Sequence, residues 1–391
     1  MSQPSQFPAL YPARAIIDLP AISHNVASMT SRVRSHHPQA QVMAVVKANA
    51  YGHGLVPSAR AALQGGATWL GVAQASEALA LRSAGVPGRI LTWLYAPGVP
   101  FAELLAADID VSVAAPWAAH QVIAAARDTG VQARVHVKVD TGLGRNGATL
   151  DHVGEILDPL LDAQRAGLVS ITGVWSHFAF ADEPDHPTVV AQAHVFDQAI
   201  ALFEREGAHL EVRHLANSAA TLTNPAATYD LVRPGLAVYG LSPVPHLGGP
   251  QDFDLRPAMT LEADVATVKD LPAGHGVSYA HHYLTQRDTR LAVLPVGYAD
   301  GIPRHASGAH NEPGGPIALG GKRLAIAGRV CMDQVVVDIG DLPVVEGDRA
   351  VLFGDPSAGV PGAQDWADAA GTISYEITTR LADRVPRIYL T

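Results

Sequence analysis

The chain has 391 residues, of which 48% are hydrophobic and 16% are charged. This composition excludes a disordered protein and favours a compact enzyme with two domains, or one large barrel with an appendage. The formal net charge of −10 disfavours nucleic acid or an anionic membrane as the main partner. The single cysteine, Cys331, excludes an intrachain disulfide and a cysteine cluster for zinc, and we expect no metal.

The N-terminal segment 1–13 is polar and rich in proline, without the apolar centre of a signal peptide. No uninterrupted apolar stretch of the sequence is long enough to span a bilayer. We therefore expect a cytoplasmic protein without a membrane partner.

Apolar, strand-like runs alternate with Ala- and Leu-rich helical patterns through about the first 240 residues. Expected strands cover 41–46, 68–72, 89–95, 109–113, 133–139, 170–176, 211–214 and 229–232, with helices over 76–84, 116–128, 150–164 and 188–206. Eight strands that alternate with helices predict an α/β fold of the (β/α)8 barrel type. No dinucleotide fingerprint follows the first strand, which disfavours an open Rossmann-type sheet.

The pattern changes after a segment rich in proline and glycine, 241–256, which we interpret as a linker. Short strand-like runs follow at 261–268, 291–296, 324–327 and 334–338, and they predict a mostly β second domain. We place the barrel domain at 12–242 and the β-rich domain at 243–391. The early run 15–19 precedes the first barrel strand, and we expect residues 1–20 to pack on the β-rich domain.

Lys47 stands at the end of the run 42–46, which is apolar on both faces and is typical of a buried parallel strand. A lysine in such a place is costly unless its charge is paired, or its amine is neutral or covalently used. A desolvated lysine is a good Schiff-base nucleophile toward an aldehyde such as pyridoxal phosphate (PLP). Taken alone, Lys47 is better explained as a lysine that reaches outward from the strand end, and the other residues of the chain reverse that preference.

Other polar residues also follow the expected barrel strands, at the end where barrel active sites form. They are Lys138, Arg145, His177, His214, Asn217, Ser218 and Arg233. Each has a structural explanation: Ser218 caps a helix, Arg145 forms a surface ion pair, His177 is a core histidine, and the glycines of 142–147 turn the chain. Their convergence on one mouth, with a helix start suited to phosphate, favours an active site instead.

Together these motifs resemble the bacterial alanine racemases, which are PLP-dependent barrel enzymes. The matching segments extend over both domains: 46–54, 139–147, 176–183, 216–221, 232–240, 276–279, 297–301, 328–334 and 374–376. The resemblance implies interconversion of L-alanine and D-alanine, PLP as cofactor and D-alanine supply for peptidoglycan. A catabolic role is equally compatible with these residues.

By this resemblance, Lys47 holds PLP covalently and acts as the base on one face of the substrate's external aldimine, and Tyr279 acts on the opposite face. The family's tyrosine reaches the PLP of the partner subunit, which implies a homodimer with shared active sites. Both bases have reference pKa values of roughly 10, so they must be shifted or coupled near neutral pH. His177, which lies between Arg233 and the tyrosine in the family, is a candidate for that coupling.

The resemblance assigns the remaining positions by function. The phosphate contacts are Tyr51, Ser218 and Tyr375, with backbone donors near Gly235 and Leu236, and Asn217 is a further cofactor-binding residue. Arg145 matches the arginine near the phenolic oxygen and the substrate carboxylate, Met332 a backbone contact to that carboxylate, and Lys138 a lysine often carbamylated in the family. The entrance residues are Asp182, His214, Tyr298, Arg304 and Arg329.

Arg233 matches the residue at the pyridine nitrogen of the cofactor. Many PLP enzymes place a carboxylate there, which keeps the nitrogen protonated and the ring strongly electron-withdrawing. An arginine is always a donor and therefore disfavours that protonation. The weaker electron sink suits a racemase, which must return a proton to Cα and avoid transamination.

Four rival functions are disfavoured. A PLP-dependent decarboxylase is disfavoured by Arg233 and Tyr279, and a broader racemase by the lack of export and disulfide signals. A PLP carrier resembles the barrel alone, so the second domain with its tyrosine disfavours it. A barrel used purely as an interaction scaffold would leave the strand-end residues as a coincidence.

Overall fold

The computed structural model describes residues 10–309 and 312–391, and the chain divides into two compact units. The barrel unit comprises Ile22–Ala50 and Leu55–Leu255. The C-terminal unit comprises the described residues up to Ala21, the short segment Tyr51–Gly54, and the described residues from Arg256 onward. Within the described ranges, no helix is both long and apolar enough to cross a membrane.

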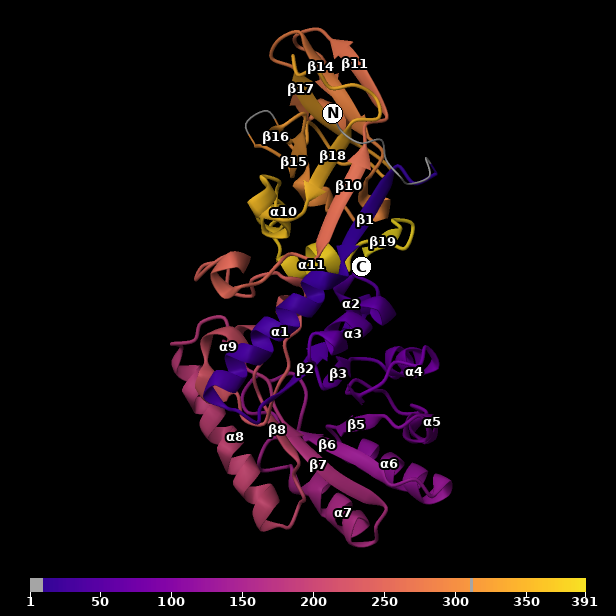
Figure 1. Ribbon diagram of the computed structural model, residues 1–391, viewed down its shortest axis with the longest axis vertical. Coiled ribbons are helices and arrows are strands. Elements are labelled where there is room, and N and C mark those ends of the chain that lie inside the picture. The colour runs from indigo at the N-terminus through magenta and orange to yellow at the C-terminus, as the bar shows by residue number, and fades with distance from the viewer. Residues whose placement is uncertain (1–9, 310–311) are drawn as a thin grey trace. The chain divides into compact units, whose positions relative to one another are not determined.

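Eight parallel strands form the sheet of the barrel unit, in the order β8-β7-β6-β5-β4-β3-β2-β9 (Figure 1). They are β2 (Gln41–Val45), β3 (Trp69–Val72), β4 (Arg89–Thr92), β5 (Asp110–Val113), β6 (Ala133–Lys138), β7 (Val169–Trp175), β8 (Val212–His214) and β9 (Leu231–Val232). The two end strands are joined where Asp230 N–H donates to the Arg213 carbonyl (3.1 Å) and Arg233 N–H to the Ala216 carbonyl (2.9 Å). The predicted (β/α)8 barrel is confirmed.

Helices lie outside this sheet (Figure 1). They are α1 (Leu19–His36), α3 (Leu55–Gln64), α4 (Ala75–Ser83), α5 (Phe101–Ala106), α6 (Pro116–Thr129), α7 (Gly154–Arg165), α8 (Pro187–Arg205) and α9 (Ser218–Thr223), with 3-10 turns at Pro225–Ala227, Leu236–Tyr239 and Pro250–Phe253. The sequence of α6 shows why such helices have fixed ends. Pro116 supplies a preset φ and no surplus N–H at the first turn, and Gly130 closes the helix with φ +69°.

The C-terminal unit is built mostly from β-strands, as predicted. Its six-stranded sheet has the order β16-β15-β18-β10-β1-β19, and it is accompanied by a three-stranded sheet, β11-β14-β17, and the pair β12-β13 (Figure 1). The strands are β1 (Ala13–Asp18), β10 (Met259–Asp264), β11 (Thr267–Leu271), β12 (Gly276–Val277), β13 (Tyr283–Leu284), β14 (Thr289–Leu294), β15 (Pro316–Leu319), β16 (Lys322–Ala325), β17 (Val335–Gly340), β18 (Arg349–Phe353) and β19 (Arg387–Leu390), and the helices are α10 (Ala363–Ala370) and α11 (Ser374–Thr379).

Strand β1 joins this sheet although it precedes the barrel in the chain. It pairs antiparallel with β10 and parallel with β19. The buried Arg14 fixes the first pairing, because its Nε donates to Glu262 (2.7 Å) and its Nη1 to Asp264 (2.8 Å), both on β10. The expectation that the run 15–19 belongs with the β-rich part is confirmed.

Two local predictions are corrected by the structure. The single strand expected at 261–268 is two strands, β10 and β11, because the chain passes from one sheet to the other at Val265 and Ala266. The segment 241–256 is not a free linker, since Leu241, Val244 and Leu255 are buried and the segment contains a 3-10 turn.

Candidate active site

Lys47 follows β2 directly, after five buried apolar residues, and its own side chain is half-buried. Burial lowers the pKa of Lys47, the positive charge of Arg145 lowers it further, and the carboxylate of Glu77 acts in the opposite direction. Within residues 10–309 and 312–391, its amine has no hydrogen bond or ion pair. The folded barrel unit therefore favours the neutral, nucleophilic form of this lysine.

The chain after Lys47 forms a left-handed turn, labelled α2 (Lys47–Tyr51) in Figure 1. The residues Ala48–Tyr51 all have φ between +52° and +54°, a conformation that costs a non-glycine residue about 1–2 kcal/mol. Two side chains hold the turn: Glu77 Oε1 accepts from Ala48 N–H (2.6 Å), and Asn49 Oδ1 accepts from Leu55 N–H (2.8 Å). Strain held in this way is characteristic of functional sites.

Lys138 ends β6 and points into the barrel, where it is 4% exposed. The carboxylate of Asp140 accepts the backbone N–H groups of Gly142, Leu143 and Gly144, which turns the chain sharply and leaves Arg145 exposed on the loop. The turning role considered for these glycines is therefore confirmed. Within the described ranges Arg145 has no ion pair, so the surface-pair explanation for it is wrong.

Arg233 follows β9 and is buried beneath the mouth of the barrel. Its Nη2 donates to the carbonyl of Ser176 (2.7 Å), to the carbonyl of Leu215 (3.2 Å) and to Nδ1 of His177 (3.3 Å). Burial lowers the pKa of Arg233 to about 9, which still leaves the guanidinium protonated at neutral pH. The same burial, followed by the charges of Arg233 and Lys138, lowers the pKa of His177 well below its usual value.

A chain of hydrogen bonds extends from Arg233 through the barrel interior. An arginine only donates, so its Nη1 contact with His214 Nδ1 (3.2 Å) places the proton of His214 on Nε2. That proton faces His136 Nδ1 (2.9 Å), and the remaining nitrogen of His136 lies 3.5 Å from Asp110 Oδ2. Asp110 is held by Arg134 (2.6 Å). The fully buried His214 therefore supports Arg233 in the barrel interior, away from any surface, in contrast to its predicted place at an entrance.

Trp175, the last residue of β7, lies beneath these cations. Lys138 Nζ is 3.6 Å and Arg233 Cζ 4.8 Å from the centroid of its ring, and the ring of His214 stacks on it at 5.5 Å. The indole N–H donates to Ser112 Oγ (2.8 Å), which fixes the ring. Sequence reasoning missed Trp175, and its one signal was its position at a strand end. The negative face of the ring favours cations that have no carboxylate beside them.

The predicted helix start at 217–221 is confirmed as α9, with one change of role. Asn217, not Ser218, is the cap, because its Oδ1 accepts from Ala220 N–H (3.1 Å). Ser218 Oγ instead accepts from the N–H groups of Gly235 (2.7 Å) and Ala237 (3.3 Å). Its hydroxyl proton is thus left to donate to a further acceptor. Leu236 lies in the same turn and is buried.

In the C-terminal unit, three segments that carry predicted site residues are joined. Ser278 Oγ donates to the carbonyl of Arg329 (2.7 Å), and the N–H groups of Tyr298 and Ala299 donate to the carbonyls of residues 331 and 332 (3.0 and 2.9 Å). Tyr279 and Met332 thereby lie on connected backbone, although their side chains are 69% and 52% exposed.

The segment Tyr51–Gly54 is packed within the C-terminal unit. The ring of Tyr51 lies 6.2 Å from that of Tyr375, and burial raises its pKa. Gly52 has φ +85°, and a Cβ there would lie 2.2 Å from the Thr378 carbonyl oxygen, so only glycine fits. The structure thus brings together the two predicted phosphate-contacting tyrosines.

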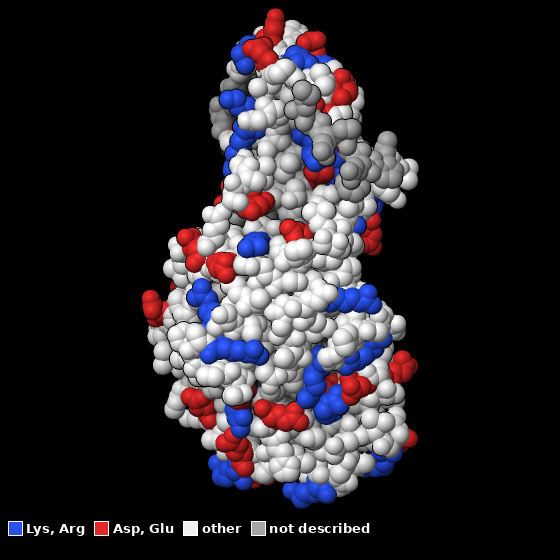
Figure 2. Space-filling model, in the orientation of Figure 1, with Lys and Arg blue, Asp and Glu red and all other residues white. Residues whose placement is uncertain are grey.

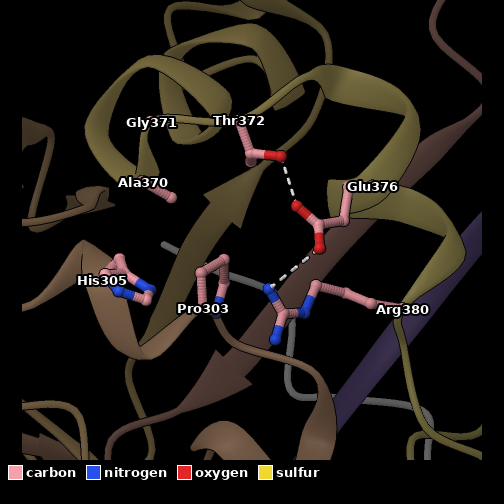
Figure 3. Close-up of a pocket in the computed structure, with 7 residues that line it drawn as sticks. All are labelled: Pro303, His305, Ala370, Gly371, Thr372, Glu376 and Arg380. Atoms are coloured by element: carbon pink, nitrogen blue, oxygen red, sulfur yellow. Dashed lines mark hydrogen bonds and ion pairs between the residues drawn. The ribbon is translucent and has the colours of Figure 1, made fainter.

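The C-terminal unit also has a pocket, lined by Pro303, His305, Ala370, Gly371, Thr372, Glu376 and Arg380 (Figure 3). In this pocket the Thr372 hydroxyl donates to Glu376, which pairs with Arg380 at 4.0 Å. Of the predicted entrance residues, Asp182 and Arg304 are exposed on their separate units. On the face shown in Figure 2, basic and acidic side chains are interspersed.

A (β/α)8 barrel whose strand ends gather a lysine of lowered pKa and several further cations is typical of a barrel enzyme for anionic ligands. Comparison with known proteins identifies its family. The alanine racemase N-terminal domain family matches residues 17–243, and the alanine racemase C-terminal domain family matches residues 258–389. The chain belongs to the alanine racemase family and is an enzyme of the isomerase class, an amino acid racemase.

The similarity extends over nearly the whole chain. The alanine racemase of Beutenbergia cavernae is 58% identical over 381 residues, which cover 97% of this chain and 98% of the relative. The crystal structure of an alanine racemase from D-cycloserine-producing Streptomyces lavendulae has a TM-score of 0.94 at 53% identity and covers 99% of this chain and 98% of that one. The Bacillus anthracis alanine racemase with bound L-Ala-P has a TM-score of 0.87 at 34% identity, with 98% of this chain and 96% of that one covered.

Proposed function

We propose that the chain interconverts L-alanine and D-alanine with pyridoxal phosphate, by a two-base mechanism. The observation that carries this proposal is the set of cations at the barrel mouth. Lys47, Lys138, Arg145 and Arg233 act on one another or on His177 through their charges, and the pKa of Lys47 is lowered. Such a site attracts an anionic cofactor and a carboxylate substrate while it keeps one amine free to react.

The barrel residues fit pyridoxal phosphate. The aldehyde matches the amine of Lys47, whose pKa is lowered, the pyridine nitrogen matches the guanidinium of Arg233, and the phosphate matches the free hydroxyl proton of Ser218. Further phosphate contacts are proposed for Tyr51, Asn217, Gly235, Leu236 and Tyr375. When bound, the cofactor supplies the electron withdrawal that makes the Cα proton of an amino acid acidic.

Lys47 and Tyr279 take the proton-transfer roles in this proposal. Lys47, freed by the incoming amino group, removes or returns the Cα proton on one face, and Tyr279 does so on the other. Arg233 stays protonated and so keeps the pyridine nitrogen unprotonated, which limits electron withdrawal and favours return of the proton to Cα. His177 contacts Arg233 and is proposed to couple it to the tyrosine.

The exposure of Tyr279 supports a homodimer as part of the proposal. A tyrosine that is 69% exposed in one chain is poorly placed to hold a fixed direction alone. Met332, a predicted site residue of the same unit, is also 52% exposed. We propose that a second copy covers this surface, so that Tyr279 of one chain acts at the Lys47 site of the other. The barrel unit would hold most of the cofactor, and the C-terminal unit would supply the tyrosine.

Arg145 is proposed to bind and orient the substrate carboxylate, together with the backbone N–H of Met332, and Lys138 is proposed to position Arg145. Burial, followed by the charges of Arg233 and Arg145, lowers the pKa of Lys138 well below its usual value. A neutral amine is the form that adds CO2 and loses a proton to give a carbamate, so Lys138 is a proposed carbamylation site. The carbamate would hold Arg145 by a charge-assisted hydrogen bond.

The remaining assignments belong to the surroundings of the site. Substrate entry is proposed along Asp182, Tyr298, Arg304 and Arg329. The proposed setting is the cytoplasm, with D-alanine supplied for peptidoglycan.

Proton NMR of the purified chain with pyridoxal phosphate and L-alanine in deuterated water tests the proposal, with D-alanine assayed in parallel. We expect the Cα–H signal to disappear while D-alanine rises to near equality with L-alanine. No Cα exchange by a protein with cofactor bound would exclude alanine as the substrate.

A further inference from the structure

The turn after Lys47 is strained, and one side chain from a different strand–helix connection holds it. Four consecutive non-glycine residues, Ala48–Tyr51, adopt left-handed conformations, which together disfavour this turn by several kcal/mol. Without a tether, the segment would lower its free energy by moving to an ordinary conformation. Such a movement would redirect the lysine that precedes it.

The tether is the carboxylate of Glu77, at the start of α4. Its Oε1 accepts the N–H of Ala48 at 2.6 Å, a short bond to the residue next to Lys47. Its Oε2 accepts the N–H groups of Ala73 and Gln74, both at 3.0 Å. One carboxylate thus binds three backbone donors on two loops that are far apart in sequence.

Capping of α4 explains only half of this arrangement. A glutamate at the third position of a helix commonly reaches back to the cap residue, and Oε2 does so here. Oε1 is not needed for that task and points at the turn instead. The charge of Glu77 also raises the pKa of Lys47, which opposes the effects of burial and of Arg145.

We propose that Glu77 is a positioning residue that holds the left-handed turn after Lys47 and thereby fixes the direction of the lysine amine. The inference rests on the proposed function, in which Lys47 binds pyridoxal phosphate. The role of Glu77 is to pre-organise the amine of Lys47, since a small misplacement of a reacting group costs a large factor in rate.

The test measures how fast Lys47 of the full-length chain, freed of cofactor with hydroxylamine, binds pyridoxal phosphate. The amine nitrogen forms a C=N bond to the aldehyde carbon, and the aldehyde oxygen leaves as water. The rate is followed by absorbance across a range of pH, and borohydride trapping with peptide mass spectrometry locates the bond. Variants are Glu77→Ala and Glu77→Gln, the second of which keeps one acceptor oxygen.

The matched control is Asp365→Asn. Asp365 occupies the third position of α10 in the C-terminal unit and caps it by accepting Gly362 N–H (2.7 Å). It therefore reproduces the loss of a capping carboxylate without touching the turn after Lys47.

We expect the high-pH rate to fall roughly tenfold in Glu77→Ala and by less in Glu77→Gln, with Asp365→Asn at the wild-type rate. The carboxylate of Glu77 favours the protonated form of Lys47. Its removal should therefore lower the pKa of Lys47 and move the midpoint of the pH profile to lower pH in both Glu77 variants. A lower rate at an unchanged midpoint supports the tether and overturns the charge effect.

An unchanged rate and midpoint in both Glu77 variants would overturn the proposal. An equal slowing by Asp365→Asn would also overturn it, because the loss would then reflect general destabilisation. If the wild-type chain forms no trapped bond at Lys47, the proposed function itself fails, which distinguishes the two outcomes.

Discussion

The barrel unit and the C-terminal unit present their candidate residues in opposite ways. In the barrel, Lys138 and Arg233 are buried and held by an aromatic ring, carbonyl groups and histidines. In the C-terminal unit, Tyr279 and Met332 lie on a well-connected backbone, but their side chains are largely exposed. The candidate residues of the barrel unit are thus fixed by their surroundings within one chain, whereas the candidate side chains of the C-terminal unit are exposed.

In both units, left-handed backbone lies next to the proposed base. Lys47 precedes the left-handed run Ala48–Tyr51, and Tyr279 is flanked by Ser278, Ala280 and His281, which all have positive φ. Non-glycine residues rarely adopt this conformation, and each needs support from its surroundings. Runs of left-handed backbone therefore adjoin both positions that the family resemblance assigns as bases.

The largest effect is expected from Lys47→Ala, which removes the nucleophile of the barrel half. We expect no covalent pyridoxal phosphate and a loss of racemisation of at least about 10³-fold, because no other group forms the bond. Absorbance and D-alanine assays measure both. Lys269→Ala, at an exposed lysine of β11, is the matched control and should retain full activity; equal losses would contradict the assignment.

The second prediction joins the two halves. Tyr279→Phe alone should strongly bias Cα exchange toward one enantiomer, since only one face then has a base. When Lys47→Ala and Tyr279→Phe chains are unfolded, mixed equally and refolded, random pairing in a two-fold dimer should restore about a quarter of the wild-type activity.

That recovery depends on hybrid dimers that contain one site with both bases intact. The control is the Lys47→Ala chain unfolded and refolded alone, which should restore no activity. Absence of recovery in the first mixture, with dimers present by light scattering, would contradict sites shared between chains.

The third prediction concerns the aromatic floor of the barrel half. Trp175→Leu removes the ring face beneath Lys138 and Arg233, and we expect racemisation to fall about tenfold, or about 1.4 kcal/mol. Trp175→Phe should lose less, because it keeps a ring. Ser112→Ala, which removes only the partner of the indole N–H, is the control; if it matches Trp175→Leu, the ring face is not responsible.

The smallest effect is a pH dependence of stability that belongs to the barrel half. Burial lowers the pKa of His136, His177 and His214. As pH falls below about 6.5, the unfolded chain takes up protons that the folded barrel refuses, so the free energy of unfolding decreases.

Each such histidine contributes up to about 1.4 kcal/mol per pH unit in this range. Urea unfolding between about pH 5 and about pH 7 measures the slope of the free energy of unfolding against pH. His214→Gln should make it shallower, whereas replacement of the exposed His152 should not. A free energy of unfolding that rises toward acid pH would contradict the prediction.

The periodic parts of the fold were predictable from sequence. All eight barrel strands appear within a few residues of their expected positions, because buried parallel strands are short, continuous apolar runs between turn signals. Helices α1 and α3 and strands β15, β18 and β19 were not predicted. Strands of that kind depend on pairing partners distant in the chain, which local pattern does not reveal.

The site was predictable only in part, for the same reason. Lys47 is visible because a lysine at the end of an apolar run is unusual, whereas Glu77 reads as an ordinary residue in a helix start. Its contact with Ala48 spans 29 positions and depends on two neighbouring barrel strands. The predicted entrance position of His214 likewise failed, because the partners that bury it come from β6 and β9.

The placement of β1 also has a consequence for synthesis of the chain. Its neighbour β10 begins about 240 residues later, and its other neighbour, β19, is the last strand. At about 5–20 residues per second, a ribosome needs roughly 10–50 s after β1 to make β10. During that time β1 has no strand to pair with. This strand includes Arg14, which is buried in the folded chain. A chaperone that binds nascent strand edges would therefore meet this chain first at residues 13–18.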